Sequence, residues 1–244
     1  MKTVSSLSLL FVLCLLGFTA QTQGQKKPES WTSWSKKDAE KLLTASPWAQ
    51  TQVETDLTEM FYSPTSPNRG ATNAAGRAKE GATNQEVGIS YHIRFFSARP
   101  IRQALARLYQ IQRQPKTEEE MQGLEKFANA VPSNVIIVTV TYESTDGRAA
   151  GRVMQLFESA ITATLKNKAY LERKDGTRLF LEEYVPPGKD GFGARFIFPR
   201  MFQERPFITP DAGEVRFFAE FADSMKLNMR FPVSQMKYND QLEY

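Results

Sequence analysis

The period of the hydrophobic pattern changes near residue 169. Before that point, several segments place apolar residues every three or four positions, as amphipathic helices do. From Ala169 onward apolar and polar residues alternate, which is typical of strands with one buried face. Helices and strands that are separated along the chain in this way favour the α+β class. The sequence therefore predicts one α+β domain over 25–244, with a mixed or antiparallel sheet, about three to four helices and a β-rich part from 169.

Two helices are predicted in the first half of the mature chain. Ser35 can cap a helix that stops near Ser46, because Pro47 disfavours a helical residue before it. Pro100 fits the first turn of a second helix, whose apolar residues recur at helical spacing up to Ile111.

Two further helices are predicted between 117 and 165. Thr117 and Glu120 form a capping box for the first of them. The second follows Asp146 and carries a continuous apolar stripe. The stripe consists of Val153, Leu156, Phe157, Ala160, Ile161 and Leu165.

The most β-branched run of the chain lies within 134–142 and predicts a central strand. Asp175 and Gly176, between two alternating segments, predict a hairpin with a two-residue turn. The other predicted strands cover 52–61, 87–96, 194–198, 215–221 and 227–233, with one more between 236 and 244.

Residues 1–24 have the features of a cleaved secretory signal. Lys2 precedes an apolar block over 4–20, which is shorter than the roughly 20 apolar residues of a comfortable membrane span. Small residues place the cut before Gln25 or before Gln21. An uncleaved anchor is the alternative, and the missing stop-transfer charges disfavour it. We expect an exported protein, periplasmic or extracellular, with no transmembrane helix in the mature chain.

The segment 63–86 differs in composition from the rest of the chain. It is rich in Pro, Gly, Ala, Thr and Asn, and it contains no large apolar residue. Such a segment cannot bury enough apolar surface to order itself, so it predicts a disordered surface loop between two strands.

The residue types that catalysis and metal binding use most are scarce. Cys14 is the only cysteine and lies in the predicted signal, so the mature chain has no thiolate nucleophile and no disulfide. His92 is the single histidine, whereas the usual catalytic zinc sites need two or three. No Gly-x-Ser-x-Gly nucleophile motif accompanies it. We therefore expect no metal and no cofactor, and a strand-face position for His92.

The charge balance restricts the class of partner. The chain has 31 basic and 27 acidic residues, a formal net charge of +4. The two signs are interspersed, which excludes a nucleic-acid footprint, while a mild basic excess suits an anionic envelope polymer. We expect a partner in the envelope, either such a polymer or a protein.

The densest basic region spans the end of one predicted strand and the helix after it. Its candidate anion-binding residues are Arg94, Arg99, Arg102 and Arg107. Guanidinium groups bind phosphate and carboxylate bidentately, so the four predict a site for phosphate, a lipid headgroup or an acidic glycan. A solvated helix face is the alternative.

Trp31, Trp34 and Trp48 surround the first predicted helix. They form either a clamp that packs this helix onto the core or an aromatic surface that stacks against carbohydrate. Both interpretations stay open at the level of the sequence.

Catalysis without cysteine, and with one histidine on a strand, would rely on paired carboxylates of the glycosidase kind. The candidate acids on or near strands are Glu172, Glu182, Glu183, Glu204 and Glu220. Charges in the hairpin around Asp175 also fit cross-strand pairing, which needs no catalytic role.

The segment Trp-x-x-Trp-Ser-Lys-Lys-Asp-Ala-Glu-Lys-Leu-Leu, from Trp31, resembles uncharacterised secreted proteins of soil bacteria, as does the C-terminal Leu-Glu-Tyr. The resemblance implies export and supplies no catalytic residue. The sequence thus favours a non-catalytic envelope binding or scaffold module, with a cofactor-free hydrolase as the alternative.

Overall fold

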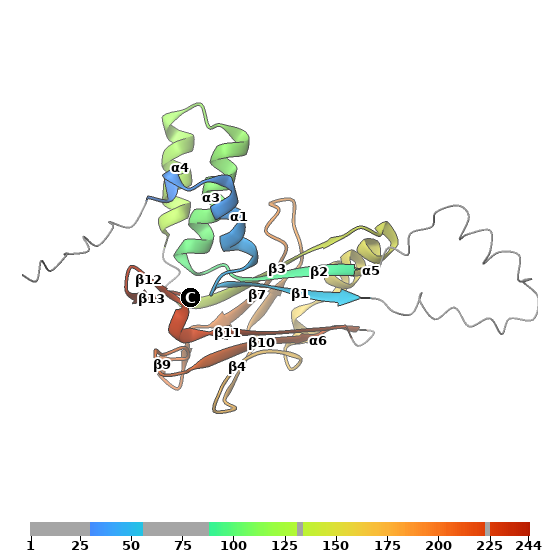
Figure 1. The fold of residues 1–244 in the computed structure, drawn as a ribbon. Coiled ribbons are helices and arrows are strands. Elements are labelled where there is room, and N and C mark those ends of the chain that lie inside the picture. Colours follow the sequence, from blue (N-terminus) through green and yellow to red (C-terminus); the bar gives the residue numbers. More distant parts are fainter. Residues whose placement is uncertain (1–29, 56–87, 131–133, 223–224) are drawn as a thin grey trace, which may run out of the picture.

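The computed structural model describes residues 30–55, 88–130, 134–222 and 225–244. The predicted signal over 1–24 and the predicted loop over 63–86 lie outside these residues. Two antiparallel sheets pack against each other, and helices cover the outer face of one of them (Figure 1). The predicted α+β class is confirmed.

The larger sheet has five strands in the order β1-β2-β3-β7-β6, and every neighbouring pair is antiparallel. Its strands are β1 (Ala49–Thr55), β2 (Gly88–Phe95), β3 (Val135–Ser144), β7 (Ala194–Pro199) and β6 (Glu183–Val185). β3 is the β-branched run and occupies the centre, as predicted, because its side chains fill both faces.

The smaller sheet has four strands in the order β11-β10-β4-β5. They are β11 (Lys226–Pro232), β10 (Glu214–Glu220), β4 (Ala169–Arg173) and β5 (Arg178–Phe180). β10 alternates buried and half-buried residues, so one face of this sheet meets the core and the other faces outward.

Short elements complete the β-rich part. They are β8 (Met201–Phe202) with β9 (Arg205–Pro206), the 3-10 turn η4 (Val233–Gln235), and β12 (Lys237–Tyr238) with β13 (Gln241–Leu242). β6, β8 and β9 have no counterpart among the predicted strands, because two or three residues are too few to show a period.

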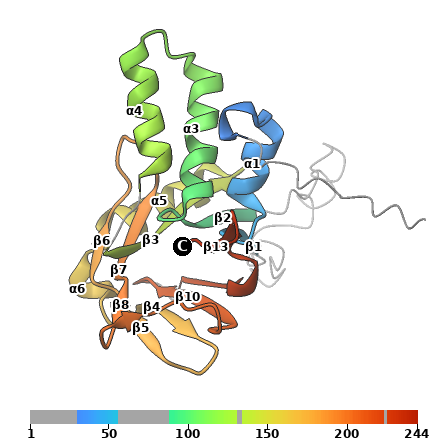
Figure 2. The ribbon, with the colours of Figure 1, turned by 90° about the vertical axis from the view of Figure 1, so that its left-hand side faces the viewer.

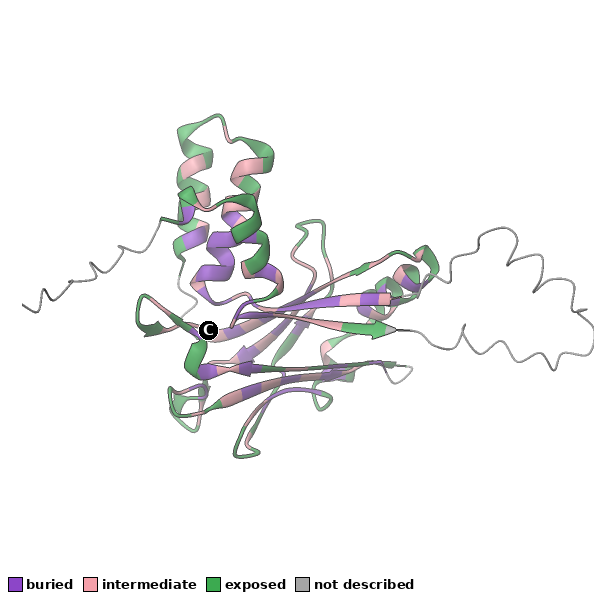
Figure 3. Cartoon of the chain, in the orientation of Figure 1, coloured by how far each residue is buried: buried purple, intermediate pink, exposed green. Residues whose placement is uncertain are grey.

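The helices are η1 (Trp31–Ser33), α1 (Lys36–Thr44), α3 (Arg99–Arg113), α4 (Glu118–Asn129), α5 (Gly147–Ser159) and α6 (Thr162–Leu165). α3 and α4 form an antiparallel pair, the helical hairpin, which stands out from the sheets beside α1 (Figures 1 and 2). The outer end of this hairpin is exposed, while the base of α3 is buried (Figure 3).

The predicted helix starts are confirmed. Ser35 accepts a hydrogen bond from the backbone N–H of Asp38 at 3.1 Å. Both bonds of the capping box between Thr117 and Glu120 are present at the start of α4. These signals act over three residues, which is why the sequence alone reveals them.

The predicted apolar stripe over 153–165 is not one helix. α5 ends at Ser159, Ala160 is extended, and Ile161 is 56% exposed. The chain turns here because the hydroxyl of Thr162 accepts the backbone N–H of Tyr184 at 3.0 Å, which ties α6 to β6.

The hairpin of β4 and β5 is confirmed, but its turn is longer than predicted. Arg173 donates its N–H to Thr177 O at 3.0 Å, so three residues, 174–176, form the turn instead of two. Gly176 adopts φ +85°, the left-handed position of a three-residue hairpin loop. Asp175 stabilises the longer turn because its Oδ1 accepts the N–H of Thr177 at 2.9 Å.

Aromatic side chains fill the space between the two sheets. Phe196 of β7 and Phe217 of β10 meet edge to face at 5.1 Å between ring centroids, and both are fully buried. The rings account for the aromatic C-terminal half as core filling.

Candidate functional site

Two of the four candidate arginines form hydrogen bonds inside the fold. Arg94 lies on β2, and Arg102 lies near the start of α3. Arg94 donates to Leu43 O at 2.6 Å and to the hydroxyl of Thr141 at 2.7 Å. Arg102 is buried and donates to the carbonyls of Phe96, Ser97 and Ala130. Burial lowers the pKa of each guanidinium to about 10.

The other two arginines also bind groups of the chain itself. Arg99 forms an ion pair with Glu243 at 2.9 Å. Arg107 donates to Trp34 O at 2.6 Å and to Gln110 at 2.8 Å. The structure therefore assigns each guanidinium a different internal partner and does not gather the four around any hollow described below. Their role in anion binding stays a prediction.

The three tryptophans lie where segments pack together. Trp48 is buried, and its indole N–H donates to Glu243 O at 2.7 Å. Trp31 is buried against Ala106 and Ala128 of the helical hairpin, and half-buried Trp34 packs beside it. Two of the three rings are thus enclosed by the fold, which is the placement of a clamp.

The candidate carboxylates are engaged or exposed. Glu172 accepts from Arg178 at 2.5 Å and from Arg216 at 2.8 Å, and Glu220 lies 3.7 Å from Lys226. Glu182, Glu183 and Glu204 are exposed on the surface. The pairing of Glu172 is the cross-strand arrangement that the hairpin pattern suggested. Nothing in these contacts favours the hydrolase alternative.

His92 occupies the strand face of β2. It is buried, its Nδ1 lies 2.9 Å from the hydroxyl of Thr51, and its Nε2 lies 3.6 Å from Glu143. Burial, and then the charge of Arg94, lower the pKa of the imidazole below its ordinary value. Within the described ranges, no group of three or more His, Cys, Asp or Glu residues could hold a metal ion.

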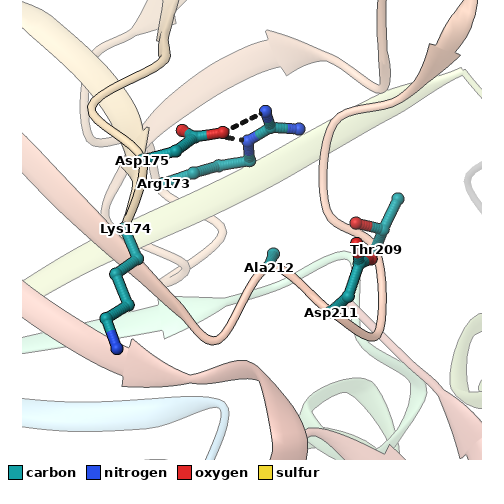
Figure 4. Close-up of a pocket in the computed structure, with 6 residues that line it drawn as sticks. All are labelled: Arg173, Lys174, Asp175, Thr209, Asp211 and Ala212. Carbon is teal, nitrogen blue, oxygen red and sulfur yellow. Dashed lines mark hydrogen bonds and ion pairs between the residues drawn. The ribbon is translucent and has the colours of Figure 1, made fainter.

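A charged hollow lies between the β4–β5 turn and the loop before β10 (Figure 4). Arg173 and Asp175 form an ion pair at 2.5 Å on one side, and Thr209 and Asp211 lie on the other. The hydrogen bond from Arg173 lowers the pKa of Asp175 to about 2. Because the charges of the ion pair offset each other, this hollow does not present a net anion site.

A second hollow, of about 610 Å³, is formed by the helical hairpin and the loop that precedes β7. We call it the groove. It is lined by Leu105, Ala106, Leu108, Tyr109 and Gln112 of α3, Glu120, Gly123, Leu124 and Phe127 of α4, and Asp190, Gly191 and Phe192 of the loop. The lining is mostly apolar, and the volume lies in the range of ligand sites in proteins.

The loop side of the groove is held in place by specific contacts. The ring of Phe192 stacks on Phe127, with centroids 5.8 Å apart and planes 15° apart, and also contacts Phe96 at 5.0 Å. Asp190 accepts the N–H of Phe192 at 3.1 Å and forms an ion pair with Arg195 at 2.7 Å. These contacts of the chain itself fix the position of Phe192 at the groove.

Sequence reasoning missed the groove. Phe192 stands between two glycines in a loop that follows two prolines, and nothing local shows that it reaches α4. The helical spacing of Leu105 and Leu108 predicts a helix but does not show that both are half-buried and line the groove. The sequence signal for the groove would have been a helix with more apolar residues on its surface than the core can cover.

No family model, no curated protein and no solved structure matches the chain. None of the helices in the described ranges is both long enough and apolar enough to cross a membrane.

Proposed function

We propose that this chain is an exported, non-catalytic binding module of the cell envelope, and that its groove receives an amphipathic helix of a protein partner. The observation that carries the proposal is the groove between the helical hairpin and Phe192, which is mostly apolar and whose loop side is held by the stacking of Phe192 on Phe127. The predicted signal over 1–24 supports export.

The spacing of the lining residues suits a helical partner. Leu105, Leu108 and Gln112 lie at i, i+3 and i+7 on α3, and Glu120, Leu124 and Phe127 lie at i, i+4 and i+7 on α4. Each helix thus turns one face toward the groove. A mostly apolar hollow along two neighbouring helices is the kind of surface that binds the apolar face of a third helix.

Gly123 leaves one position in the lining of the groove without a side chain. It lies inside α4, where glycine costs about 1 kcal/mol relative to alanine. A Cβ added at this position would meet no atom within 4 Å, so packing inside the chain does not require glycine. A partner helix can approach the bare backbone of α4 more closely here than at any larger residue.

The charges beside the groove favour a basic partner. Glu120 of α4 and Asp190 of the loop are the charged residues that line the groove, and both are acidic. A helix with lysine or arginine on its polar face would place these charges near the acidic residues. Such complementarity raises the association rate and selects the partner.

The test uses a fluorescent Leu/Lys peptide with the leucines on one helical face. Residues 25–244 should bind it, as measured by fluorescence anisotropy, and a peptide of the same composition in scrambled order should bind at least about tenfold more weakly. A Gly123→Ala variant should be more stable than the wild type by about 0.5–1 kcal/mol and should bind the peptide less tightly, because its methyl group narrows the groove.

Gln122→Ala is the matched control, since Gln122 is exposed on the same helix and does not line the groove. It should bind the peptide like the wild type. Equal binding of the two peptides, or unchanged binding by Gly123→Ala, would overturn the proposal.

A further inference from the structure

The outer face of the four-stranded sheet carries an aromatic row. Phe180 of β5, Tyr170 of β4 and Phe218 of β10 stand directly opposite one another in the strand register. Their ring centroids are 5.8 Å and 5.0 Å apart, and the rings of Tyr170 and Phe218 are stacked at 23°. An outward sheet face normally carries polar residues, so three aligned rings depart from the usual pattern.

This face is open. α1, α3 and α4 lie beyond the five-stranded sheet, on the far side of the molecule from it (Figures 1 and 2). Phe180 is 45% exposed, and Phe218 is half-buried. Tyr170 is shielded by the guanidinium of Arg178, which lies 4.5 Å from its ring centroid. The two outer rings are therefore the ones that a ligand can touch.

A row of charged residues runs beside the aromatic row on the same face of the sheet. It lies two positions further along each strand. Glu172 lies opposite Arg178 on one side and Arg216 on the other, and forms ion pairs with both, at 2.5 Å and 2.8 Å. Arg230, on β11, is paired with Glu214 at 2.6 Å. Arg178 and Arg216 share the carboxylate of Glu172, so the three arginines and two glutamates of this row carry a net charge of only +1 and exert a weak field on a charged polymer.

The paired groups can still form hydrogen bonds. A guanidinium has five N–H donors in a fixed plane, and a carboxylate has about four acceptor positions, so one ion pair leaves several of them unused. Arg178 and Arg230 have side chains that are 48% and 65% exposed, which makes these donors accessible. The face thus combines flat apolar rings with hydrogen-bond donors and acceptors whose net charge is small.

We infer that this face is a second binding site, for a neutral polysaccharide. A sugar ring has an apolar side of C–H groups, which packs against the electron-rich face of an aromatic ring, and an edge of hydroxyl groups, which bonds to guanidinium and carboxylate. An acidic glycan or a nucleic acid would instead need unpaired cations. The site lies on the four-stranded sheet, whereas the groove is formed by the helical hairpin and the loop before β7, so the site does not depend on the groove.

The test is affinity electrophoresis of residues 25–244 in native gels that contain a soluble β-glucan, a mannan or a galactomannan, with alginate as the anionic comparison. At least one neutral glycan should retard the wild type, and added salt should not abolish the retardation, since the ligand carries no charge. Phe180→Ala should weaken the interaction at least about tenfold, and Phe180→Trp should retain it.

Tyr109→Ala, in the groove, is the matched control and should leave glycan retardation unchanged. Failure of the peptide test with intact glycan binding would therefore reject the groove alone. Three results would overturn the glycan site: no retardation by any neutral glycan, retardation by alginate only, or neutral binding that persists in both Phe180→Ala and Phe218→Ala. Self-association that depends on Phe180, without glycan binding, would assign the face to a second copy of the chain.

Discussion

At the scale of single residues, the fold depends on polar side chains enclosed among apolar ones. Arg102 and His92 are buried, and both are held by groups of the chain itself. Removing either side chain would leave the buried groups that it bonds without a partner, so each of these residues should be sensitive to substitution.

Arg102→Ala should destabilise the protein by about 3 kcal/mol. The substitution leaves the carbonyls of Phe96, Ser97 and Ala130 without their donor and removes a side chain from the base of α3. Chemical denaturation of the purified variant measures the loss. Arg113→Ala, exposed at the end of the same helix, is the control and should change stability by less than about 0.5 kcal/mol. Equal effects of the two substitutions would show that the buried bonds contribute nothing.

The imidazole of His92 should make stability depend on pH. Its pKa in the folded protein lies below the ordinary value of 6.5, so the unfolded chain binds the proton more readily. Stability should be complete above pH 6.5 and should decrease as the pH falls from 6.5 towards the lowered pKa. Urea unfolding across this window measures the decrease. His92→Asn, which has no titrating group, should remove this part of the pH dependence, and an unchanged profile would contradict the assignment.

At the scale of elements, the local signals of the sequence were reliable and the long-range ones were hidden. The cap at Ser35, the capping box at Thr117 and the central strand β3 each depend on neighbouring residues or on composition. The break between α5 and α6 depends on a hydrogen bond between Tyr184 and Thr162, 22 residues apart, which the apolar stripe does not show.

The candidate sites show the same division. The arginines were predicted from their density along the chain, but the carbonyls that Arg94 and Arg102 bind come from segments that only the fold brings near. The groove likewise needs Phe192 to meet Phe127, a contact with no trace in either local sequence. The sequence could therefore predict the class of fold and most elements, but not the surfaces between them.

Gly193, where the groove loop enters β7, should be intolerant of substitution. It has φ +79°, and a Cβ there would lie 2.2 Å from Val140 O. Gly191 has a similar φ of +77° but open space around it. Gly191→Ala should therefore cost about 1–2 kcal/mol from backbone strain, and Gly193→Ala clearly more, because β7 must also move away from β3. Thermal unfolding of both variants separates the effect of backbone strain from that of the clash with Val140 O. Equal losses of stability in the two variants would contradict this prediction.

At the scale of the whole molecule, the two sheets are joined at one edge by a side chain. Gln52 of β1 donates to Lys226 O and accepts the N–H of Asn228, both at 2.8 Å, and so continues the hydrogen bonding of β11. Gln52→Ala should destabilise the protein by about 1–2 kcal/mol, as measured by denaturant unfolding. Val53→Ala, exposed on the same strand, should have a smaller effect. The reverse order would show that the bridge does not hold the sheets together.

The groove and the aromatic row lie on opposite sides of this joined body, which suits a module that holds a protein and a polysaccharide at the same time (Figure 1). The core between the two sheets separates the sites, so each can be altered without the other. We attribute the proposed scaffold role to these two separate sites.

The most direct measurement is methyl NMR of leucine-labelled residues 25–244 during titration with the Leu/Lys peptide. The account predicts chemical-shift changes concentrated at Leu105, Leu108 and Leu124, which line the groove, and little change at Leu171 and Leu227 in the core. Shifts that spread over the core leucines, or a spectrum that does not change at saturating peptide, would contradict it.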